Sequence, residues 1–301
     1  MTDSPLAAVP ELPRRLVYFG TPAMAVAPLE ALVHNGFEVA LVVTGADKRR
    51  GRGGQLTPSP VKAAALALDL TVSDRVEDCL TVGADLGVVV AFGRLIRRPV
   101  LELLPMINIH FSLLPRWRGA APVERALLAG DTVTGTCLMQ LEVGLDTGPI
   151  YDQRVIPIRE RATAPELRAE LVDLGVQQLL DSLSRGLRNP LPQEGEAVYA
   201  SKFEVAEFEI DWRLPAAYID RLVRLGSAWT TFRGKRLRVH AARPAEGSSE
   251  RTPGSLEGVE VTCGDGRGVA LDMVQPEGKA PMEALAWLRG ARPEAGELLG
   301  N

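Results

Sequence analysis

Short apolar runs alternate with stretches of helical periodicity through the first part of the chain. Residues 15–19 (RLVYF) and 37–44 (FEVALVVT) have the pattern of buried strands, and the apolar positions of residues 23–35 between them have helical spacing. Continuously apolar strands joined by a helix are typical of βαβ units in a parallel sheet. Further strands are predicted at residues 86–92, 107–111 and 134–141. We therefore expect an α/β fold, with a Rossmann-like domain built on a mostly parallel sheet.

Helical periodicity returns between and after these strands. A long amphipathic helix is predicted at residues 164–185, where leucines recur near helical spacing. Pro122 suits the first turn of a helix that ends near residue 129. Shorter helices are expected at residues 61–70 and before residue 104. Residues rich in Pro and Gly then end the pattern, so we expect a disordered lead-in at 1–14, a first domain at 15–187, a linker at 188–206 and a second domain at 207–301.

The second domain carries short strand patterns separated by turns. After a helical stretch at residues 215–225, strands are predicted at 229–232, 237–241, 258–263 and 269–274, and a short helix at 282–289. Closely spaced short strands with glycine-containing turns are typical of a small β-barrel. We therefore expect an OB-like barrel for residues 207–301.

Composition and charge restrict the class of protein. Hydrophobic residues make up 46% and charged residues 24% of the 301 residues, which is ordinary for a soluble globular chain. No apolar run reaches the roughly 18 residues that a membrane span needs. The formal net charge of −4 excludes an overall basic field, so any nucleic-acid contact has to come from a local patch. We expect a cytoplasmic protein.

The sequence lacks the motifs of a dinucleotide-binding site and of a cysteine-based metal or disulfide site. The turn at residues 20–22 (GTP) has no G-x-G-x-x-G fingerprint, which argues against a nicotinamide or flavin oxidoreductase. Cys79, Cys137 and Cys263 are isolated and lack the spacing of metal ligands or of a disulfide framework. We expect them to be reduced, and we expect no bound metal.

Two segments carry an excess of basic residues. Residues 45–60 form either a solvated loop or a mobile loop that contacts a polyanion. Residues 213–243 contain seven Arg and one Lys against one acid, with aromatic side chains interleaved. They form either a solvated barrel surface or a face that contacts RNA. The candidate contacts in the two segments are Lys48, Arg49, Arg50, Arg52, Arg233, Lys235, Arg236 and Arg238.

Asn108, His110 and Asp146 are the candidate catalytic residues. Side chains two positions apart on a strand point to the same face, so Asn108 and His110 project side by side. An amide can donate a hydrogen bond to an oxyanion, an imidazole can transfer a proton at neutral pH, and Asp146 could assist the imidazole. Because Ser112 lacks a G-x-S-x-G setting and Cys137 lies within a strand, we expect direct acyl transfer between nitrogens, without a covalent acyl-enzyme. Spacing alone also allows a purely structural histidine, which is how we interpret His34 and His240.

The residues around this trio resemble those of the folate-dependent formyltransferases. The matching motifs are N-x-H-x-S-L-L-P at 108–115, R-x-R-G at 116–119 and G-L-D-T-G at 144–148. Further matches narrow the resemblance to the members that formylate methionyl-tRNA. These are F-G-T-P at 19–22, G-R-G in the basic loop with T-P-S-P-V-K at 57–62, R-W-R-G-A-A-P at 116–122 and I-D-W at 210–212. The resemblance covers most of the chain, both domains included.

The resemblance implies a donor, an acceptor and a set of site residues. The donor would be 10-formyltetrahydrofolate, and the acceptor the α-amino group of methionyl-initiator tRNA. Asn108, His110 and Asp146 would be the catalytic trio, and the basic loop at residues 47–56 would lie toward the acceptor end of the tRNA. We expect the chain to act as a monomer. The folate site would be lined by Ser112, Leu113, Leu114 and Pro115 and bordered by Val90, Ala91, Phe92 and Gly93.

Departures from the family pattern leave other acceptors open. Residues 71–85 look short, and residues 225–229 (LGSAW) replace a longer segment that carries aromatic residues and proline. Gly53 and Gly54 stand where further lysines are common. The alternatives are a formyltransferase acting on an amino sugar nucleotide, a formyl-folate hydrolase and a catalytically silent RNA-binding relative. The basic segments favour tRNA as the acceptor, and the intact trio favours chemistry over binding alone.

Overall fold

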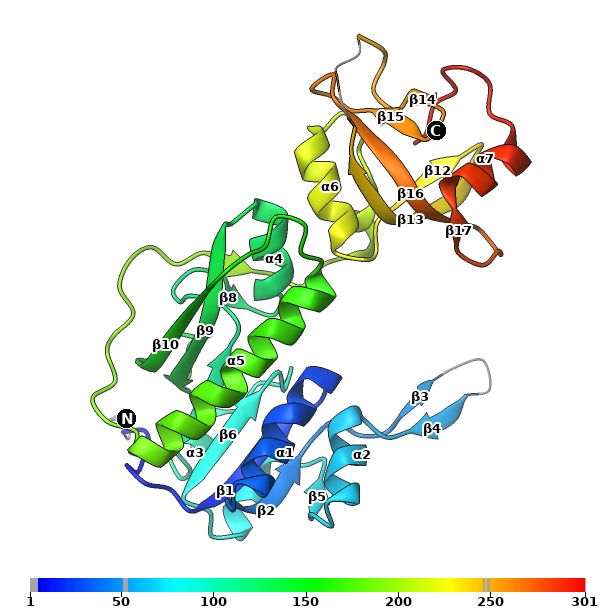
Figure 1. Cartoon of the computed structure of the whole chain (residues 1–301). Coiled ribbons are helices and arrows are strands. Elements are labelled where there is room, and N and C mark those ends of the chain that lie inside the picture. Colours follow the sequence, from blue (N-terminus) through cyan, green and yellow to red (C-terminus); the bar gives the residue numbers. More distant parts are fainter. Residues whose placement is uncertain (1–4, 51–53, 246, 248–249, 301) are drawn as a thin grey trace. The chain divides into compact units, whose positions relative to one another are not determined.

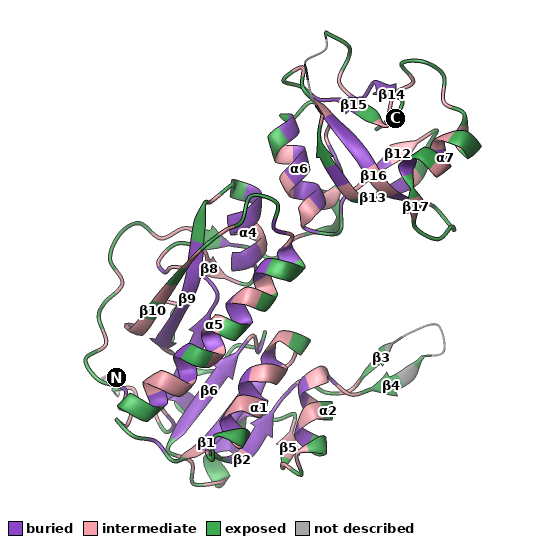
Figure 2. Cartoon of the chain, viewed as in Figure 1, coloured by how far each residue is buried: buried purple, intermediate pink, exposed green. Residues whose placement is uncertain are grey.

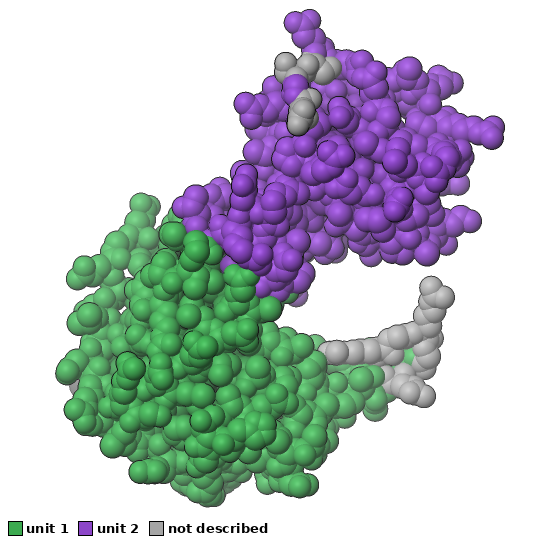
Figure 3. All heavy atoms as spheres, in the orientation of Figure 1, with its two compact units in different colours: residues 1–122, 133–157, 168–201 green, residues 123–132, 158–167, 202–301 purple. Residues whose placement is uncertain are grey.

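The computed structural model describes residues 5–50, 54–245, 247 and 250–300 (Figure 1). The chain divides into two compact units, each treated separately below (Figure 3). Unit 1 comprises residues 1–122, 133–157 and 168–201, and unit 2 comprises residues 123–132, 158–167 and 202–301. No helix in the described ranges is both long and apolar enough to cross a bilayer.

Seven of the described strands of unit 1 form one sheet, in the order β10-β9-β7-β6-β1-β2-β5. The five strands from β7 to β5 pair in parallel, and β9 and β10 add antiparallel pairs at one edge. The predicted α/β fold with a mostly parallel sheet is therefore confirmed. The strands are β1 (Arg15–Gly20), β2 (Glu38–Val43), β5 (Val72–Ser73), β6 (Leu86–Val90), β7 (Met106–His110), β9 (Val133–Gln140) and β10 (Ile150–Pro157).

Strand β10 was not predicted from the sequence. Its residues alternate between partly buried and exposed, and they include Asp152, Gln153 and Arg154. This strand lies at the edge of the sheet and pairs only with β9 among the described strands. An edge strand can remain polar because solvent reaches it, so it lacks the apolar run by which the central strands were recognised.

Helices cover the sheet of unit 1, and α5 (Ala164–Arg185) has the predicted bounds. Within unit 1, Gly175 of α5 packs against Ile109 of β7, where a Cβ atom would lie 3.0 Å from the Ile109 Cγ2. The other helices of unit 1 are η1 (Ala23–Ala25), α1 (Val26–His34), α2 (Pro60–Ala67), η2 (Val76–Thr81) and α3 (Arg98–Leu101). Ser59 caps α2 by accepting a hydrogen bond of 3.0 Å from the Lys62 backbone N–H.

The two faces of strand β7 have different surroundings. Ile109 faces α5 through its contact with Gly175, and Ile107 shares that face because it lies two positions away. Both side chains are buried, and β7 is buried along its length (Figure 2). Met106 points to the opposite side and packs in a cluster that includes Phe19 and Val89. Because side chains alternate along a strand, Asn108 and His110 share the face of Met106. Two polar residues thus interrupt an apolar face at the carboxyl end of a central strand.

The basic segment after β2 is a hairpin and not an open loop. Strands β3 (Lys48–Arg50) and β4 (Gln55–Thr57) pair antiparallel, with Lys48 opposite Thr57 and Arg49 opposite Leu56. The prediction of a loop was wrong for these residues, because charged residues at successive positions hide the alternation typical of a strand. Residues 51–53, among them Arg52, lie outside the described residues, and so does the side chain of Arg50.

Residues 191–200, which we call the strap, run along unit 1 after α5. Leu191 bridges to Ile150, and β11 (Tyr199–Ala200) pairs in parallel with β8 (Arg118–Gly119). The sequence had placed these residues in a linker because they are rich in Pro and polar residues. Part of the expected lead-in also makes contacts, since the Ala7 N–H donates to the Leu101 carbonyl at 3.0 Å.

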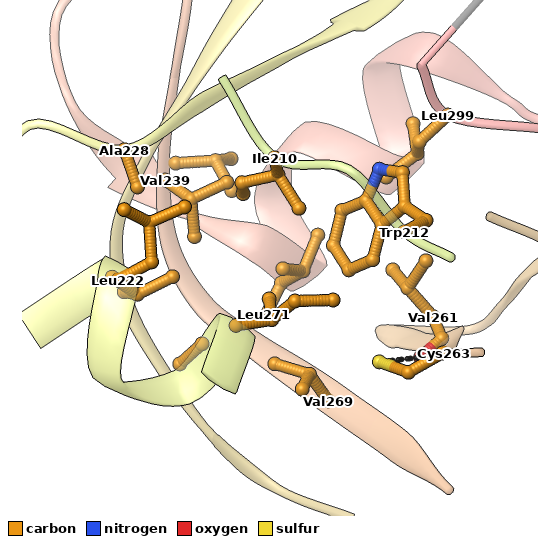
Figure 4. Close-up of a cluster of buried hydrophobic side chains, with 14 of the residues drawn as sticks. Ile210, Trp212, Leu222, Ala228, Val239, Val261, Cys263, Val269, Leu271 and Leu299 are labelled. Atoms are coloured by element: carbon orange, nitrogen blue, oxygen red, sulfur yellow. Dashed lines mark hydrogen bonds between the residues drawn. The ribbon is translucent and has the colours of Figure 1, made fainter. Parts of the chain in front are cut away.

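Unit 2 is built on a six-stranded antiparallel sheet among its described residues, in the order β12-β13-β16-β15-β14 with β17 on β16. Trp212 lies at the centre of its core, where its Nε1–H donates to the Thr230 Oγ1 at 3.0 Å. Leu222 and Leu271 belong to the same core (Figure 4). The elements are α4 (Pro122–Ala129), η3 (Val205–Phe208), α6 (Ala216–Arg224), β12 (Trp229–Phe232), β13 (Lys235–Pro244), β14 (Leu256–Glu257), β15 (Glu260–Thr262), β16 (Gly268–Pro276), β17 (Met282–Glu283) and α7 (Ala284–Ala291).

Candidate active site

The side-chain amide of Asn108 lies near the carboxyl end of β7. The residue is 8% exposed, yet within the described chain its side chain makes no hydrogen bond. The buried side-chain oxygen and nitrogen atoms without a partner in the described residues are Thr136 Oγ1 and Gln178 Oε1, so the Asn108 amide atoms are not fully enclosed and a ligand can reach them. This leaves two N–H donors available for an oxygen atom of a ligand at the carboxyl edge of the sheet, where ligands of α/β folds bind.

The imidazole of His110 has a defined orientation. Its Nε2 lies 2.8 Å from the backbone carbonyl oxygen of Trp117. A carbonyl oxygen can only accept, so Nε2 carries the proton in this contact. In the neutral ring Nδ1 then holds the lone pair, and it faces the Asp146 Oδ2 at 3.6 Å. That separation is too long for a hydrogen bond, so Nδ1 is not committed to the carboxylate.

Asp146 lies in the turn after β9 and is held by backbone. Its Oδ2 accepts a hydrogen bond of 2.8 Å from the Gly119 N–H. Its own φ is +50°, and the φ of Trp117, whose carbonyl contacts His110, is +65°. L-residues rarely adopt these angles, and such conformations concentrate at functional sites where the surrounding structure enforces them. The geometry therefore brings together all three residues of the predicted trio.

Glycines allow the close approaches that build this region. A Cβ atom on Gly148 would lie 2.0 Å from the carbonyl oxygen of Gln140, well inside van der Waals contact. Gly119 has a φ of +119°, and a Cβ atom there would lie 2.8 Å from the carbonyl oxygen of Ala200. Sterics thus require glycine at both positions, and at Gly119 the backbone conformation requires it as well.

The predicted folate-lining segment 112–115 contributes side chains of two kinds. Ser112 and Leu114 face inward: Ser112 is fully buried and its Oγ donates to the Arg116 carbonyl at 2.6 Å. Leu114 packs with Cys137 and Met139. Leu113 and Pro115 are partly exposed. Ser112 and Leu114 therefore shape the turn, and Leu113 and Pro115 are the residues of this segment with surface to offer a ligand.

The predicted pterin border, residues 90–93, offers mainly its backbone. Val90 and Phe92 are buried, and the Phe92 ring packs edge-on against Phe19 with centroids 5.4 Å apart. Ala91 and Gly93 both have positive φ, at +46° and +70°. The chain thus turns sharply after β6, which exposes Gly93 at the carboxyl edge of the sheet.

Gln193 of the strap is a site residue that the sequence did not indicate. Its Nε2 donates to the carbonyl oxygens of Asp146 and Gly148, each at 2.8 Å. Its Oε1 accepts from Arg118, from Nη2 at 2.6 Å and from Nε at 3.0 Å. Gln193 follows Pro192 in a segment without periodicity, so no local pattern could have identified it.

Thiol chemistry is suppressed by burial. Burial raises the pKa of Cys137, on the strand beside His110, to about 12. Desolvation likewise raises the pKa of Cys79 to about 11. A thiolate is the nucleophilic form, and it is a negligible fraction at neutral pH for such values. Within the described residues, no cluster of His, Cys, Asp and Glu is arranged to hold a metal ion.

The basic hairpin of unit 1 presents exposed cations. Lys48 and Arg49 are exposed on β3. The neighbouring acid, Asp47, is paired with Lys62 of α2 through contacts of 2.8 and 2.9 Å. Because Lys62 neutralises this carboxylate, Asp47 does not offset the positive charge of the hairpin.

The basic segment of unit 2, residues 213–243, offers fewer available cations after folding than its sequence suggests. Most of its arginines are engaged: Arg213 with Asp211, Arg224 with Asp220, Arg233 with Glu297, Arg243 with Asp272, and Arg221 with the Leu128 carbonyl. No ion-pair partner is found in the described part of the chain for Lys235, Arg236 or Arg238. Arg236 stacks on the ring of Trp229 at 3.8 Å and shares its strand face with Arg238. Of the four residues predicted here, Arg233 is the one whose charge is already compensated.

Family models match both parts of the chain. The model described as formyl transferase matches residues 14–183, and that of the formyl transferase C-terminal domain matches residues 202–292. Similar curated proteins named methionyl-tRNA formyltransferase come from Jannaschia sp. (strain CCS1) and from Clavibacter michiganensis subsp. michiganensis. Each is 42% identical; the matches cover 95% and 92% of this chain and 99% and 97% of those proteins.

Solved structures share the fold at low identity. An N-formyltransferase from Helicobacter canadensis, in complex with folinic acid and dTDP-3-aminofucose, matches with a TM-score of 0.67 at 17% identity. That match covers 87% of this chain and 99% of the other. HypX from Aquifex aeolicus in complex with tetrahydrofolic acid matches with a TM-score of 0.65 at 18% identity, over 92% of this chain and 47% of that one. At these identities the likeness concerns the fold alone.

Proposed function

We propose that this chain, which belongs to the formyl transferase family, transfers the formyl group of 10-formyltetrahydrofolate to the α-amino group of methionyl-initiator tRNA. The observation that carries the proposal is the arrangement of Asn108, His110 and Asp146 at the carboxyl edge of the sheet. Support for the acceptor comes from relatives named methionyl-tRNA formyltransferase, which align over nearly the whole chain. The reaction would take place in the cytoplasm, with the chain acting as a monomer.

The trio can carry out direct acyl transfer. The amine nitrogen forms a bond to the formyl carbon, and the bond from that carbon to N10 of the folate breaks. The Asn108 amide has free N–H groups to donate to the oxyanion of the tetrahedral intermediate. The Nδ1 of His110 can accept a proton from the attacking amine and return it to N10. Asp146, 3.6 Å from Nδ1, stabilises the imidazolium formed between these steps.

The proposed tRNA contacts combine charge with one aromatic platform. In unit 1 they are Lys48, Arg49, Arg50 and Arg52 of the hairpin region. In unit 2 they are Arg233, Lys235, Arg236 and Arg238, with the Trp229–Arg236 stack as a flat surface for a base. Phosphate groups attract such cations whatever the sequence of the nucleic acid. In this proposal residues 15–187 carry the catalytic trio, residues 188–206 link the two domains, and residues 207–301 contribute to tRNA binding.

One assay separates the acceptors. Purified protein is incubated with 10-formyltetrahydrofolate and methionyl-initiator tRNA, a dTDP-linked amino sugar or no acceptor. Formyl-methionyl-tRNA and tetrahydrofolate are then measured. We expect transfer to the tRNA and slow release without an acceptor. Transfer to the sugar alone would show that the acceptor is an amino sugar and not tRNA. Tetrahydrofolate release that is as fast without an acceptor as with one would indicate a hydrolase.

A further inference from the structure

The strap is bonded to both loops that build the candidate active site. Its Leu191 exchanges backbone hydrogen bonds of 2.8 and 2.9 Å with Ile150, just after the turn that holds Asp146. Further along, the Val198 N–H donates to the Pro115 carbonyl at 3.2 Å, and the Arg118 N–H donates to the Val198 carbonyl at 2.8 Å. A segment with the composition of a linker thus connects the 115–119 loop to the 146–150 turn.

Gln193 lies between these two attachments, and all of its polar atoms are engaged. Both donors of the Nε2 amide go to carbonyl oxygens of the turn, those of Asp146 and Gly148. The Oε1 accepts two hydrogen bonds from the guanidinium of Arg118. Hydrogen bonds from a charged donor are about twice as strong as neutral ones, so Arg118 holds the amide firmly in one orientation.

The same loop also holds the carboxylate of Asp146. The Gly119 N–H, next in the chain to Arg118, donates to Oδ2 at 2.8 Å. Asp146 is therefore fixed twice: its backbone by Gln193 and its carboxylate by Gly119. Because its φ of +50° is unfavourable for an aspartate, the turn needs such external contacts to keep this conformation.

We propose that Gln193, oriented by Arg118, is a positioning residue that sets the distance between the Asp146 carboxylate and His110. It touches neither His110 nor a reacting atom, and it acts through the backbone of the turn. The inference rests on the proposed catalytic role of Asp146. It makes the strap a functional part of the active site, although the composition of the strap resembles that of a connector.

The first test compares two neighbouring substitutions that introduce the same side chain. Gln193→Met removes every hydrogen bond of the amide at nearly constant length, and Glu194→Met places methionine at the adjacent exposed position. Displacement of a catalytic group by about 1 Å can cost about 100-fold in activity. We expect this loss in kcat for Gln193→Met, with KM for donor and acceptor little changed and full activity for Glu194→Met. A kcat of Gln193→Met equal to that of the parent would overturn the proposal.

A second test asks whether Gln193 acts through Asp146. In an Asp146→Asn background the catalytic carboxylate is already lost, so adding Gln193→Met is expected to reduce the residual kcat by less than about threefold. The same fold-loss in both backgrounds would mean that Gln193 acts by another route, for example through general destabilisation, and would overturn the proposal.

A third test needs no substrate. The chain has three histidines, so ¹⁵N-histidine labelling at fixed pH can resolve the ring nitrogens of His110. We expect Gln193→Met and Asp146→Asn to shift the His110 resonances and to leave those of His34 and His240 unchanged. Unshifted His110 resonances in Gln193→Met would overturn the proposal. If the parent protein formylates no acceptor, the proposed function fails, yet this measurement still decides whether Gln193 positions Asp146.

Discussion

The Nε2–H of His110 donates to the backbone carbonyl oxygen of Trp117 across 2.8 Å. Trp117 adopts a φ of +65°, which turns this carbonyl toward the ring. The contact selects one tautomer, and in the neutral ring it leaves the lone pair on Nδ1, the nitrogen that faces Asp146. The basic nitrogen of the proposed reaction is therefore determined by a backbone conformation seven residues further along the chain.

Replacing His110 tests its role as the proton-transfer group. His110→Ala is expected to lower kcat by about 10²- to 10⁴-fold, the usual contribution of general acid–base catalysis. Binding of tetrahydrofolate, measured by calorimetry, is expected to persist because the turn residues around the ring keep their backbone contacts. His240→Ala is the control, since His240 is exposed in unit 2 and contacts Gln275. Turnover by His110→Ala near that of the control would exclude the assigned role.

Replacing Asn108 separates stability from activity. The Asn108 side chain makes no hydrogen bond in the described chain and its amide atoms are not fully enclosed, so Asn108→Leu breaks no hydrogen bond of the fold. We expect the free energy of unfolding to stay the same or rise by about 0.5–2 kcal/mol, as when a functional polar group is removed. Loss of an oxyanion donor is expected to lower kcat by about 10²- to 10³-fold. Denaturant unfolding and steady-state kinetics on one preparation check both; a stability loss comparable to that of a core mutation would contradict this account of Asn108.

Gly148 tests the steric requirement of the turn. In Gly148→Ala the new methyl group would lie 2.0 Å from the Gln140 carbonyl, so the turn has to move. We expect destabilisation of about 1–3 kcal/mol, typical of overpacking, together with a loss of kcat through displacement of Asp146. Gly290→Ala is the matched control, because a Cβ atom there meets nothing within 4 Å. Gly290 lies within helix α7, where alanine is favoured by about 0.5–1 kcal/mol. Equal melting temperatures for the two variants would contradict the steric argument.

Exposed basic side chains are expected to contribute to tRNA binding, whereas an arginine held by a neighbouring carboxylate is expected to contribute little. Lys48→Ala, Arg49→Ala and Arg238→Ala each remove an exposed cation. We expect each to weaken tRNA binding and to reduce the slope of log K against log salt by about 0.7–0.9. Arg213→Ala is the control, because the Arg213 guanidinium is bound by Asp211 through contacts of 2.7 and 2.8 Å. Filter binding from low to moderate salt measures the slopes. A slope unchanged from the parent in all three variants would identify these side chains as solvated surface.

Asp85 provides a prediction on acid stability. Backbone N–H groups of Arg15 and Arg14 donate to its carboxylate at 2.9 Å and lower its pKa. A carboxyl group with a lowered folded-state pKa stabilises the protein above its unfolded pKa of about 3.9, and this contribution is lost as the pH falls through the folded-state value. Asp85→Asn is therefore expected to lower the melting temperature at pH 7, with the difference from the parent shrinking below about pH 4. Melting curves from pH 7 to the acid range, with Asp74→Asn as control, decide this. A difference in melting temperature that grows as the pH falls would contradict this role of Asp85.

Patterns that repeat within a few residues were predictable from the sequence. The two-residue period of a strand placed Asn108 and His110 on one face, because the direction of a side chain on a strand depends only on local backbone geometry. The bounds of α4 and α5 agree with the prediction for the same reason, since helical periodicity and a proline at the first turn are local signals. Asp146 was a candidate from its residue type and its glycine-flanked turn, and the resemblance to the formyltransferases supported its place in the trio.

Contacts between distant residues could only be decided by the tertiary structure. Gln193 meets Asp146 over a sequence separation of 47 residues, and Arg233 meets Glu297 over 64. The eight basic residues of 213–243 appear as one patch in the sequence, but folding brings carboxylates from other segments to Arg233 and Arg243. The sequence by itself thus determined the fold class and the residue types of the proposed trio, because these depend on local periodicity and on the amino acids themselves. The tertiary structure decides which basic side chains meet a carboxylate in the described chain and which groups hold Asp146. Hydrogen bonds and ion pairs form wherever folding brings two groups within about 3 Å, whatever their separation in sequence.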